Sequence, residues 1–138
     1  MPTQFGDIYN LPLIQVETSN KRQVIDITEL IENRLPDGSG LVNIFVKHTT
    51  CSVTTADLDP GTDEDFLDFL KAITPNVKWR HPHDPAHAPD HLLASLIGPD
   101  VSVPYAGKKL QLGTWQRVIL VELNGPKTRQ LEISFLSA

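Results

Sequence analysis

The sequence predicts a single α+β domain that is rich in strands and contains three helices. Three observations support this fold class. The 138 residues suffice for one hydrophobic core but are few for two domains. Many short apolar runs have the period-two alternation that is typical of strands. Three further segments carry their apolar residues at helical spacing. We therefore expect one domain over residues 1–138.

Seven segments are expected to be strands because they combine β-branched or aromatic residues with alternation. They are residues 8–18, 41–48, 51–56, 101–106, 108–112, 115–123 and 129–137. In the second segment, His48 falls on the same face as the apolar residues Val42, Ile44 and Val46. The dipeptide Asn124-Gly125 favours a hairpin between the last two segments, although their connection exceeds two residues.

Three helices are expected over residues 28–35, 62–73 and 89–97. Thr28 and Thr62 are suitable N-caps, Pro89 suits a first helical position, and Gly98 ends the third helix. The apolar sides of the last two helices are expected to be Phe66, Leu67, Phe69, Leu70 and Ile73, and Leu92, Leu93, Leu96 and Ile97.

The five histidines are the strongest functional signal. His48 ends a strand, and the other four, His81, His83, His87 and His91, lie within the stretch WRHPHDPAHAPDH. Imidazole titrates near neutral pH and is a common metal ligand, so the cluster indicates a site for a metal, an anion or acid/base chemistry. The alternative is a solvated histidine-rich loop. His87 and His91, four residues apart, can share a helix face.

Two other polar patterns are less specific. The acidic residues Asp57, Asp59, Asp63, Glu64 and Asp65 suggest a cation site, but helix capping and solvation explain the last three. In segment 115–123, Gln116 and Glu122 share a face with apolar residues. Buried polar groups need partners, so we expect these two residues to line a site or a subunit interface.

The composition excludes several classes of partner. The net charge is −5 and no run of Lys or Arg occurs, so a nucleic-acid partner is not expected. No apolar run reaches the roughly 18 residues of a membrane span, and the first ten residues lack the pattern of a secretory signal. The single cysteine, Cys51, allows no internal disulfide and suits a reducing compartment. We expect a cytoplasmic protein.

Four motifs, HTTCSVTT, WRH…DHLLASLIGP, GTWQ and ELNGPKTR, occur in this order. In this the chain resembles the YjbQ-like family, also called the secondary thiamine-phosphate synthase family, from about residue 7 to 136. The resemblance implies a compact, sandwich-like α+β fold with a large antiparallel sheet, an intracellular homotrimer, and a site around His48 and His91 with His81 nearby. It also implies weak synthesis of thiamine phosphate from a pyrimidine diphosphate and a thiazole phosphate.

The candidate site residues follow from the histidines and the motifs. His48, His81 and His91 are the catalytic candidates. Thr49, Ser52, Thr114, Gln116 and Glu122 are expected to contact a substrate. His48, His87 and His91 are candidate ligands for a divalent metal, zinc or magnesium.

The sequence departs from the family pattern at three places. Cys51 stands where Ala is frequent, Ala56-Asp57 where Asn-Glu is frequent, and His87 where Asp or Asn is common. Imidazole prefers zinc, whereas magnesium prefers oxygen ligands. The histidines therefore fit a small anion or phosphate site, with or without zinc, better than a dedicated synthase. Three hypotheses stay open: an enzyme for phosphorylated small molecules, a zinc-dependent hydrolase, and a non-catalytic ligand-binding trimer.

Overall fold

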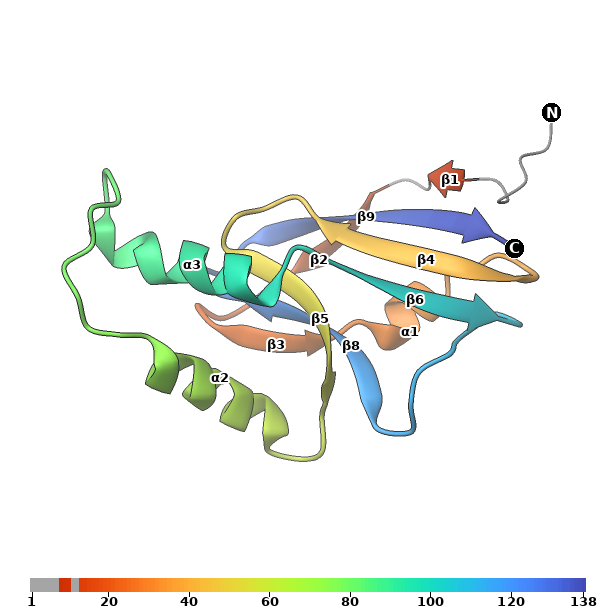
Figure 1. The fold of residues 1–138 in the computed structure, drawn as a ribbon, viewed down its shortest axis with the longest axis horizontal. Coiled ribbons are helices and arrows are strands. Elements are labelled where there is room, and N and C mark those ends of the chain that lie inside the picture. The colour runs from red at the N-terminus through yellow and green to blue at the C-terminus, as the bar shows by residue number, and fades with distance from the viewer. Residues whose placement is uncertain (1–7, 11–12) are drawn as a thin grey trace.

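The computed structural model describes residues 8–10 and 13–138. Over these residues it contains nine strands, three α-helices and one short 3-10 helix (Figure 1). The strands are β1 (Ile8–Asn10), β2 (Ile14–Glu17), β3 (Gln23–Asp26), β4 (Ser39–Val46), β5 (Cys51–Asp57), β6 (Asp100–Ala106), β7 (Lys109–Leu110), β8 (Gln116–Glu122) and β9 (Thr128–Ser137). The helices are α1 (Thr28–Glu32), α2 (Thr62–Ile73), the 3-10 helix η1 (Pro85–His87) and α3 (Ala88–Ile97).

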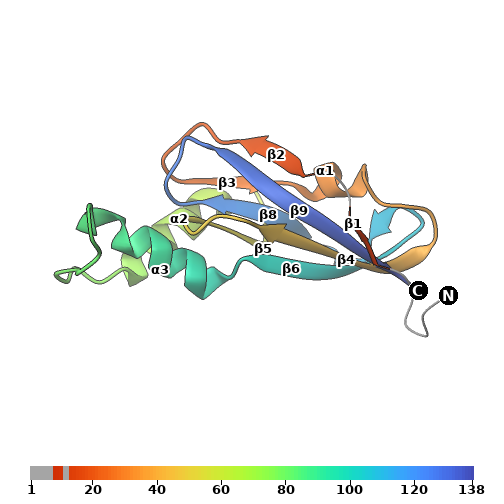
Figure 2. The ribbon, with the colours of Figure 1, turned by 90° about the horizontal axis from the view of Figure 1, so that it is seen from above.

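The strands form two antiparallel sheets, which confirms the predicted fold class. The larger sheet has the order β1-β9-β4-β6-β7, with β2 also paired to β9. The smaller sheet has the order β3-β8-β5. Both views show α2 and α3 gathered at the same end of the molecule (Figures 1 and 2). No helix in the described part of the chain is both long and apolar enough to cross a membrane.

Two apolar clusters hold these layers together. The larger one lies between the two sheets and α1, and the smaller one lies between β8 and the helices α2 and α3. Strand β8 contributes to both, since Val118 and Leu120 belong to the first cluster and Ile119 and Val121 to the second. A strand buried on both faces reads as a continuous apolar run, which explains the stretch VILV.

The predicted helices are present, but their environments differ from the prediction. Thr28 does not cap α1, because its hydroxyl accepts the N–H of Val118 at 2.9 Å. The N-cap of α2 is Gly61, with a φ of 90°. The predicted apolar sides of α2 and α3 include too many residues, since four of them are exposed: Phe69, Ile73, Leu92 and Leu96. A three-stranded sheet covers only a narrow stripe of each helix.

Three strand predictions require correction. The predicted strand 8–18 is two strands, β1 and β2, which both pair with β9, and residues 11–12 between them lie outside the described residues. Strand β3 was not predicted. The hairpin at Asn124-Gly125 is wrong, because β8 and β9 belong to different sheets. A Cβ on Gly125 would collide with the carbonyl oxygen of Asn20, so close backbone approach requires this glycine.

Candidate functional site

Two adjoining cavities lie beside three of the predicted site residues, His48, Thr49 and His91, which line both of them. The first, here the basic lobe, has a volume of about 570 Å³ and is also lined by Lys47, Thr50, His87, Asn124, Lys127 and Arg129. The second, here the neutral lobe, has a volume of about 330 Å³ and is also lined by Cys51, Ala94, Ser95 and Pro99.

The fold brings distant segments of the chain together at these lobes. His48 and Thr49 follow β4, His87 ends η1, and His91 lies in the first turn of α3. Arg129, near the start of β9, completes the basic lobe. The prediction that His48 and His91 face one cavity is confirmed, and His87 faces it as well.

His48 is held as a neutral imidazole. Its Nε2 accepts the backbone N–H of Gln130 at 2.9 Å, so the ring proton is on Nδ1. Burial lowers the pKa of His48, and the charges of Arg129 and Lys127 lower it further against the opposing effect of Glu122. The neutral ring can therefore donate one hydrogen bond from Nδ1.

His91 and His81 both leave Nε2 available. Nδ1 of His91 lies 3.2 Å from the carbonyl oxygen of Thr49, and Nδ1 of His81 lies 3.2 Å from that of Asp84. A carbonyl can only accept, so each Nδ1 carries a proton. The two rings are stacked, with centroids 4.7 Å apart. This confirms that His81 lies near His91, whereas His83 is exposed with a φ of 69°.

His87 has partners for both ring nitrogens. Its Nε2 lies 2.9 Å from a carboxylate oxygen of Asp84, and its Nδ1 lies 3.1 Å from the amide nitrogen of Asn124. An amide NH₂ donates and a carboxylate accepts, which makes Nδ1 the acceptor and Nε2 the protonated nitrogen. His87 is therefore an oriented part of the lobe wall.

These hydrogen bonds do not fit the predicted metal site of His48, His87 and His91. A metal ligand needs a free lone pair on nitrogen, and in two of these rings the unprotonated nitrogen already accepts an N–H. Within residues 8–10 and 13–138, no three His, Cys, Asp or Glu side chains are placed to hold a metal ion. The same holds for the acidic residues around Asp63.

A buried ion pair lies beneath the basic lobe. Arg129 donates from Nε to Glu122 at 2.8 Å, and from Nη2 to Glu122 and to the hydroxyl and carbonyl of Thr50. Its Nη1 has no hydrogen bond to the described residues, although Arg129 lines the lobe. Glu122 therefore orients the guanidinium so that one nitrogen remains for a ligand.

Glu122 itself is ionised and shielded from any ligand. Burial opposes its ionisation, but hydrogen bonds from Arg129, from the hydroxyl of Thr18 and from the backbone N–H of Asn124 outweigh it and lower the pKa. The carboxylate is completely buried, and Glu122, predicted to contact a substrate, lines neither lobe. It acts on the site through Arg129.

Two other predicted contacts also require correction. Gln116 pairs with Asp57 at one end of the small sheet, whereas Glu122 pairs with Cys51 at the other end, beside the lobes. Gln116 and the nearby Thr114 are thus a strand length from the histidines. Alternation gives the face of β8 on which Gln116 lies but not its position along the strand.

Ser52 is buried and its hydroxyl has no hydrogen-bond partner among the described residues, and it lines neither lobe. Its neighbour Cys51 does line the neutral lobe. Burial raises the pKa of the Cys51 thiol to about 12. The thiol is therefore uncharged at neutral pH and is not an activated nucleophile.

Sequence reasoning missed the cations of the site. Lys47, Lys127 and Arg129 line the basic lobe, and so does Asn124. A signal was present, since three of the four belong to the motif ELNGPKTR and Lys47 precedes His48. They are spread over two segments, so no basic run marks them.

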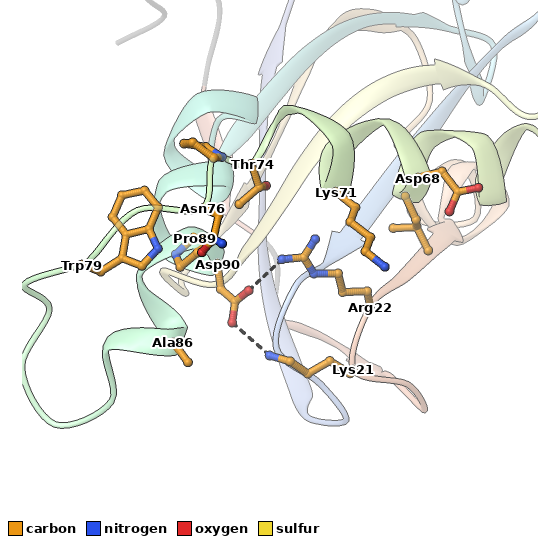
Figure 3. Close-up of a pocket in the computed structure, with 12 residues that line it drawn as sticks. Lys21, Arg22, Asp68, Lys71, Thr74, Asn76, Trp79, Ala86, Pro89 and Asp90 are labelled. Carbon is orange, nitrogen blue, oxygen red and sulfur yellow. Dashed lines mark hydrogen bonds and ion pairs between the residues drawn. The ribbon is translucent and has the colours of Figure 1, made fainter.

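A further cavity, of about 650 Å³, lies on the other side of the first turn of α3 (Figure 3). The carboxylate of Asp90 lies 3.0 Å from both Lys21 and Arg22, and Trp79 also lines the cavity. Asp90 and Asp68 balance most of the positive charge of this cavity. Unlike the basic lobe, this cavity is lined by carboxylates of its own.

Comparison with known proteins places the chain among relatives of similar length. Residues 13–138 match the family described as UPF0047 protein YjbQ-like. A UPF0047 protein of Archaeoglobus fulgidus is 35% identical over 124 residues, which cover 89% of this chain and 98% of the relative. A UPF0047 protein of Mycobacterium tuberculosis is 35% identical over 128 residues, covering 90% of this chain and 96% of the relative.

Solved structures agree with this result. A YbjQ-like protein of unknown function from Sulfolobus solfataricus has a TM-score of 0.84 and 31% identity, covering 96% of this chain and 99% of its own. A hypothetical protein from Aeropyrum pernix has a TM-score of 0.83 and 30% identity, with the same coverage. The chain belongs to the UPF0047, or YjbQ-like, family.

Proposed function

We propose that the protein binds a small phosphorylated molecule in the basic lobe, and that His91 acts on it as a general acid or base. The composition of the lobe carries this proposal. Six of its nine lining residues are basic and none is a carboxylate: Lys47, His48, His87, His91, Lys127 and Arg129. Three of the six are lysine or arginine cations: Lys47 and Arg129 pair with Glu132 and Glu122, and Lys127 has no ion-pair partner among the described residues. In a chain with a net charge of −5, this grouping favours an anionic ligand.

The hydrogen-bond donors of the lobe suit a phosphoryl group. The Nδ1–H of His48 and Nη1 of Arg129 are held by Gln130 and Glu122, respectively, so they need little reorganisation on binding. Lys127 has no ion-pair partner among the described residues and adds an exposed positive charge. Charged and preoriented donors give the stronger hydrogen bonds to phosphate oxygens.

His91 is the best placed group for proton transfer. The carbonyl of Thr49 fixes its Nδ1 as a donor, which leaves Nε2 to take up or release a proton. This arrangement orients a ring through one nitrogen so that the other can react. His81, stacked on His91, supports the ring from one side.

Binding of inorganic sulfate and phosphate, measured by calorimetry, tests the anion site. Sulfate keeps its charge between about pH 8 and pH 5.5, a range in which imidazole becomes protonated. We expect saturable binding of both ions, and sulfate affinity that rises as the pH falls. Zinc would show the opposite trend. Absence of saturable binding at millimolar concentrations would overturn the proposal.

The finer proposal is a transferase reaction of the kind that the family resemblance implies. Displacement of pyrophosphate from a pyrimidine diphosphate requires positive charge at the leaving group, and Lys127 and Arg129 can supply it. Incubation with hydroxymethylpyrimidine diphosphate and thiazole phosphate should then release pyrophosphate. Phosphate binding without any product would support the non-catalytic alternative.

We also propose a cytoplasmic homotrimer. Light scattering would contradict the trimer by giving a monomer of 15.3 kDa.

A further inference from the structure

The residues that line only the neutral lobe are all uncharged, whereas several of those that line only the basic lobe are cations. Cys51, Ala94, Ser95 and Pro99 carry no charge, since the pKa of the Cys51 thiol is raised to about 12 by burial. His48, Thr49 and His91 form the boundary between the lobes. A ligand that occupies both lobes therefore has its charged and uncharged parts on opposite sides of these residues.

We infer that the ligand is a phosphate monoester with a small, uncharged, mainly apolar organic group, and that this group occupies the neutral lobe. The inference rests on the proposed function, because it assigns the phosphoryl group to the basic lobe. It places the bond between the phosphoryl group and the organic group beside His48 and His91, which line both lobes.

The volume of the neutral lobe limits the organic group. A buried cavity of about 150 Å³ is enough for benzene, and the neutral lobe has a volume of about 330 Å³ and shares three lining residues with the basic lobe. It therefore has room for one ring with small substituents. No acidic or basic side chain lines its far wall, so a second charged group on the ligand would lose its hydration without gaining a partner.

Ser95 and Leu96 provide a matched pair of variants. Both lie in α3 and are exposed, but Ser95 lines the neutral lobe whereas Leu96 lines neither lobe. In Ser95→Phe, a large ring occupies space in the neutral lobe. In Leu96→Phe, the same side chain is added one residue further along the helix, away from it. Because both positions are exposed, neither variant disturbs the core.

The experiment compares the affinities of inorganic phosphate, methyl phosphate, phenyl phosphate and 1-naphthyl phosphate by calorimetry. We expect phenyl phosphate to bind about tenfold more tightly than phosphate, a gain typical of removing one ring face from water. Naphthyl phosphate should gain nothing more. Ser95→Phe should abolish the gain of phenyl phosphate while phosphate binds as before, and Leu96→Phe should change neither.

The outcomes separate this inference from the proposed function. If none of the four compounds binds, the anion site itself is wrong. If phosphate binds and phenyl phosphate binds no more tightly, the neutral lobe does not accept an organic group. A gain that survives Ser95→Phe, or that keeps rising with naphthyl phosphate, would indicate general surface adhesion and would also overturn the inference.

Discussion

On each side of the first turn of α3, a buried carboxylate is paired with a positively charged side chain, but the cations differ in their exposure to solvent. On one side, Glu122 lies under the basic lobe with Arg129, and both side chains are buried. On the other side, the buried Asp90 is paired with Lys21 and Arg22, whose side chains are 58% and 25% exposed. A buried cation depends fully on its carboxylate, whereas an exposed one can turn to water. The basic lobe is therefore the cavity in which a positive charge, that of Arg129, is held in one position.

The two sides are also connected. Nζ of Lys21, which is paired with Asp90, lies 2.9 Å from the amide oxygen of Asn124. The amide nitrogen of Asn124 in turn faces His87 in the basic lobe. Asp90 therefore helps to fix an amide that orients a histidine of the other cavity. We interpret the cavity at Asp90 as a support for the basic lobe.

The largest expected effect is on stability. Glu122→Gln leaves the Arg129 charge buried without a counter-ion, which costs about 3–5 kcal/mol in comparable cases. Asp90→Asn, its matched control, should cost only about 1 kcal/mol because its partners reach solvent. Urea denaturation measures both. The double variant Glu122→Gln/Arg129→Met should recover much of the stability that Glu122→Gln loses. Equal losses of stability in Glu122→Gln and Asp90→Asn would contradict the comparison.

The next effect is on ligand binding and concerns two histidines of the same cluster. His91→Ala removes a hydrogen-bonding ring from the wall of the basic lobe. A hydrogen bond to a charged group such as phosphate is worth about 1.5–3 kcal/mol, so phosphate affinity should fall roughly 10- to 100-fold. His83→Ala should change it little, because His83 lines neither lobe. Circular dichroism should show both variants folded. If His83→Ala is the more damaging change, the site has been misplaced.

A smaller effect distinguishes the two cavities by their lysines. Lys127 and Lys71 are both exposed, but one lines the basic lobe and the other the cavity at Asp90. Lys127→Met should weaken phosphate binding several-fold, and more so at low salt, since exposed charges act over about one Debye length. Lys71→Met should leave it unchanged. Equal losses of phosphate affinity in both variants would show that the overall charge of the protein, and not the basic lobe, attracts the anion.

The fold could be predicted further than the site. Periodicity gave α2 at its observed bounds and five of the strands closely, because a repeating pattern of buried residues is local. It could not show that β8 and β9 separate into two sheets, since pairing depends on partners far along the chain. Likewise, His48 and His91 were predicted from clustering and motifs, whereas Arg129 was missed. Its role depends on Glu122, seven residues away on another strand, which holds its guanidinium through Nε and Nη2.

The smallest effect concerns the pH dependence of stability and is specific to the basic lobe. The pKa of His48 is lowered in the folded protein, so the unfolded chain takes up this proton at a higher pH than the folded one does. The stabilisation is therefore complete above the unfolded value, about 6.5, and is lost as the pH falls through the folded value. Glu122 acts in the same direction, but only near the lower range of carboxylates.

His48→Gln isolates this contribution, because an amide oxygen can still accept the N–H of Gln130 but does not titrate. The free energy of unfolding of the wild type should fall more steeply between about pH 7.5 and pH 5.5 than that of the variant, since only the wild type has this imidazole to protonate. The other four histidines are common to both proteins and cancel in the difference. Parallel curves would mean that His48 is free to protonate, and that the hydrogen bond from Gln130 does not hold it as the neutral donor that the anion site requires.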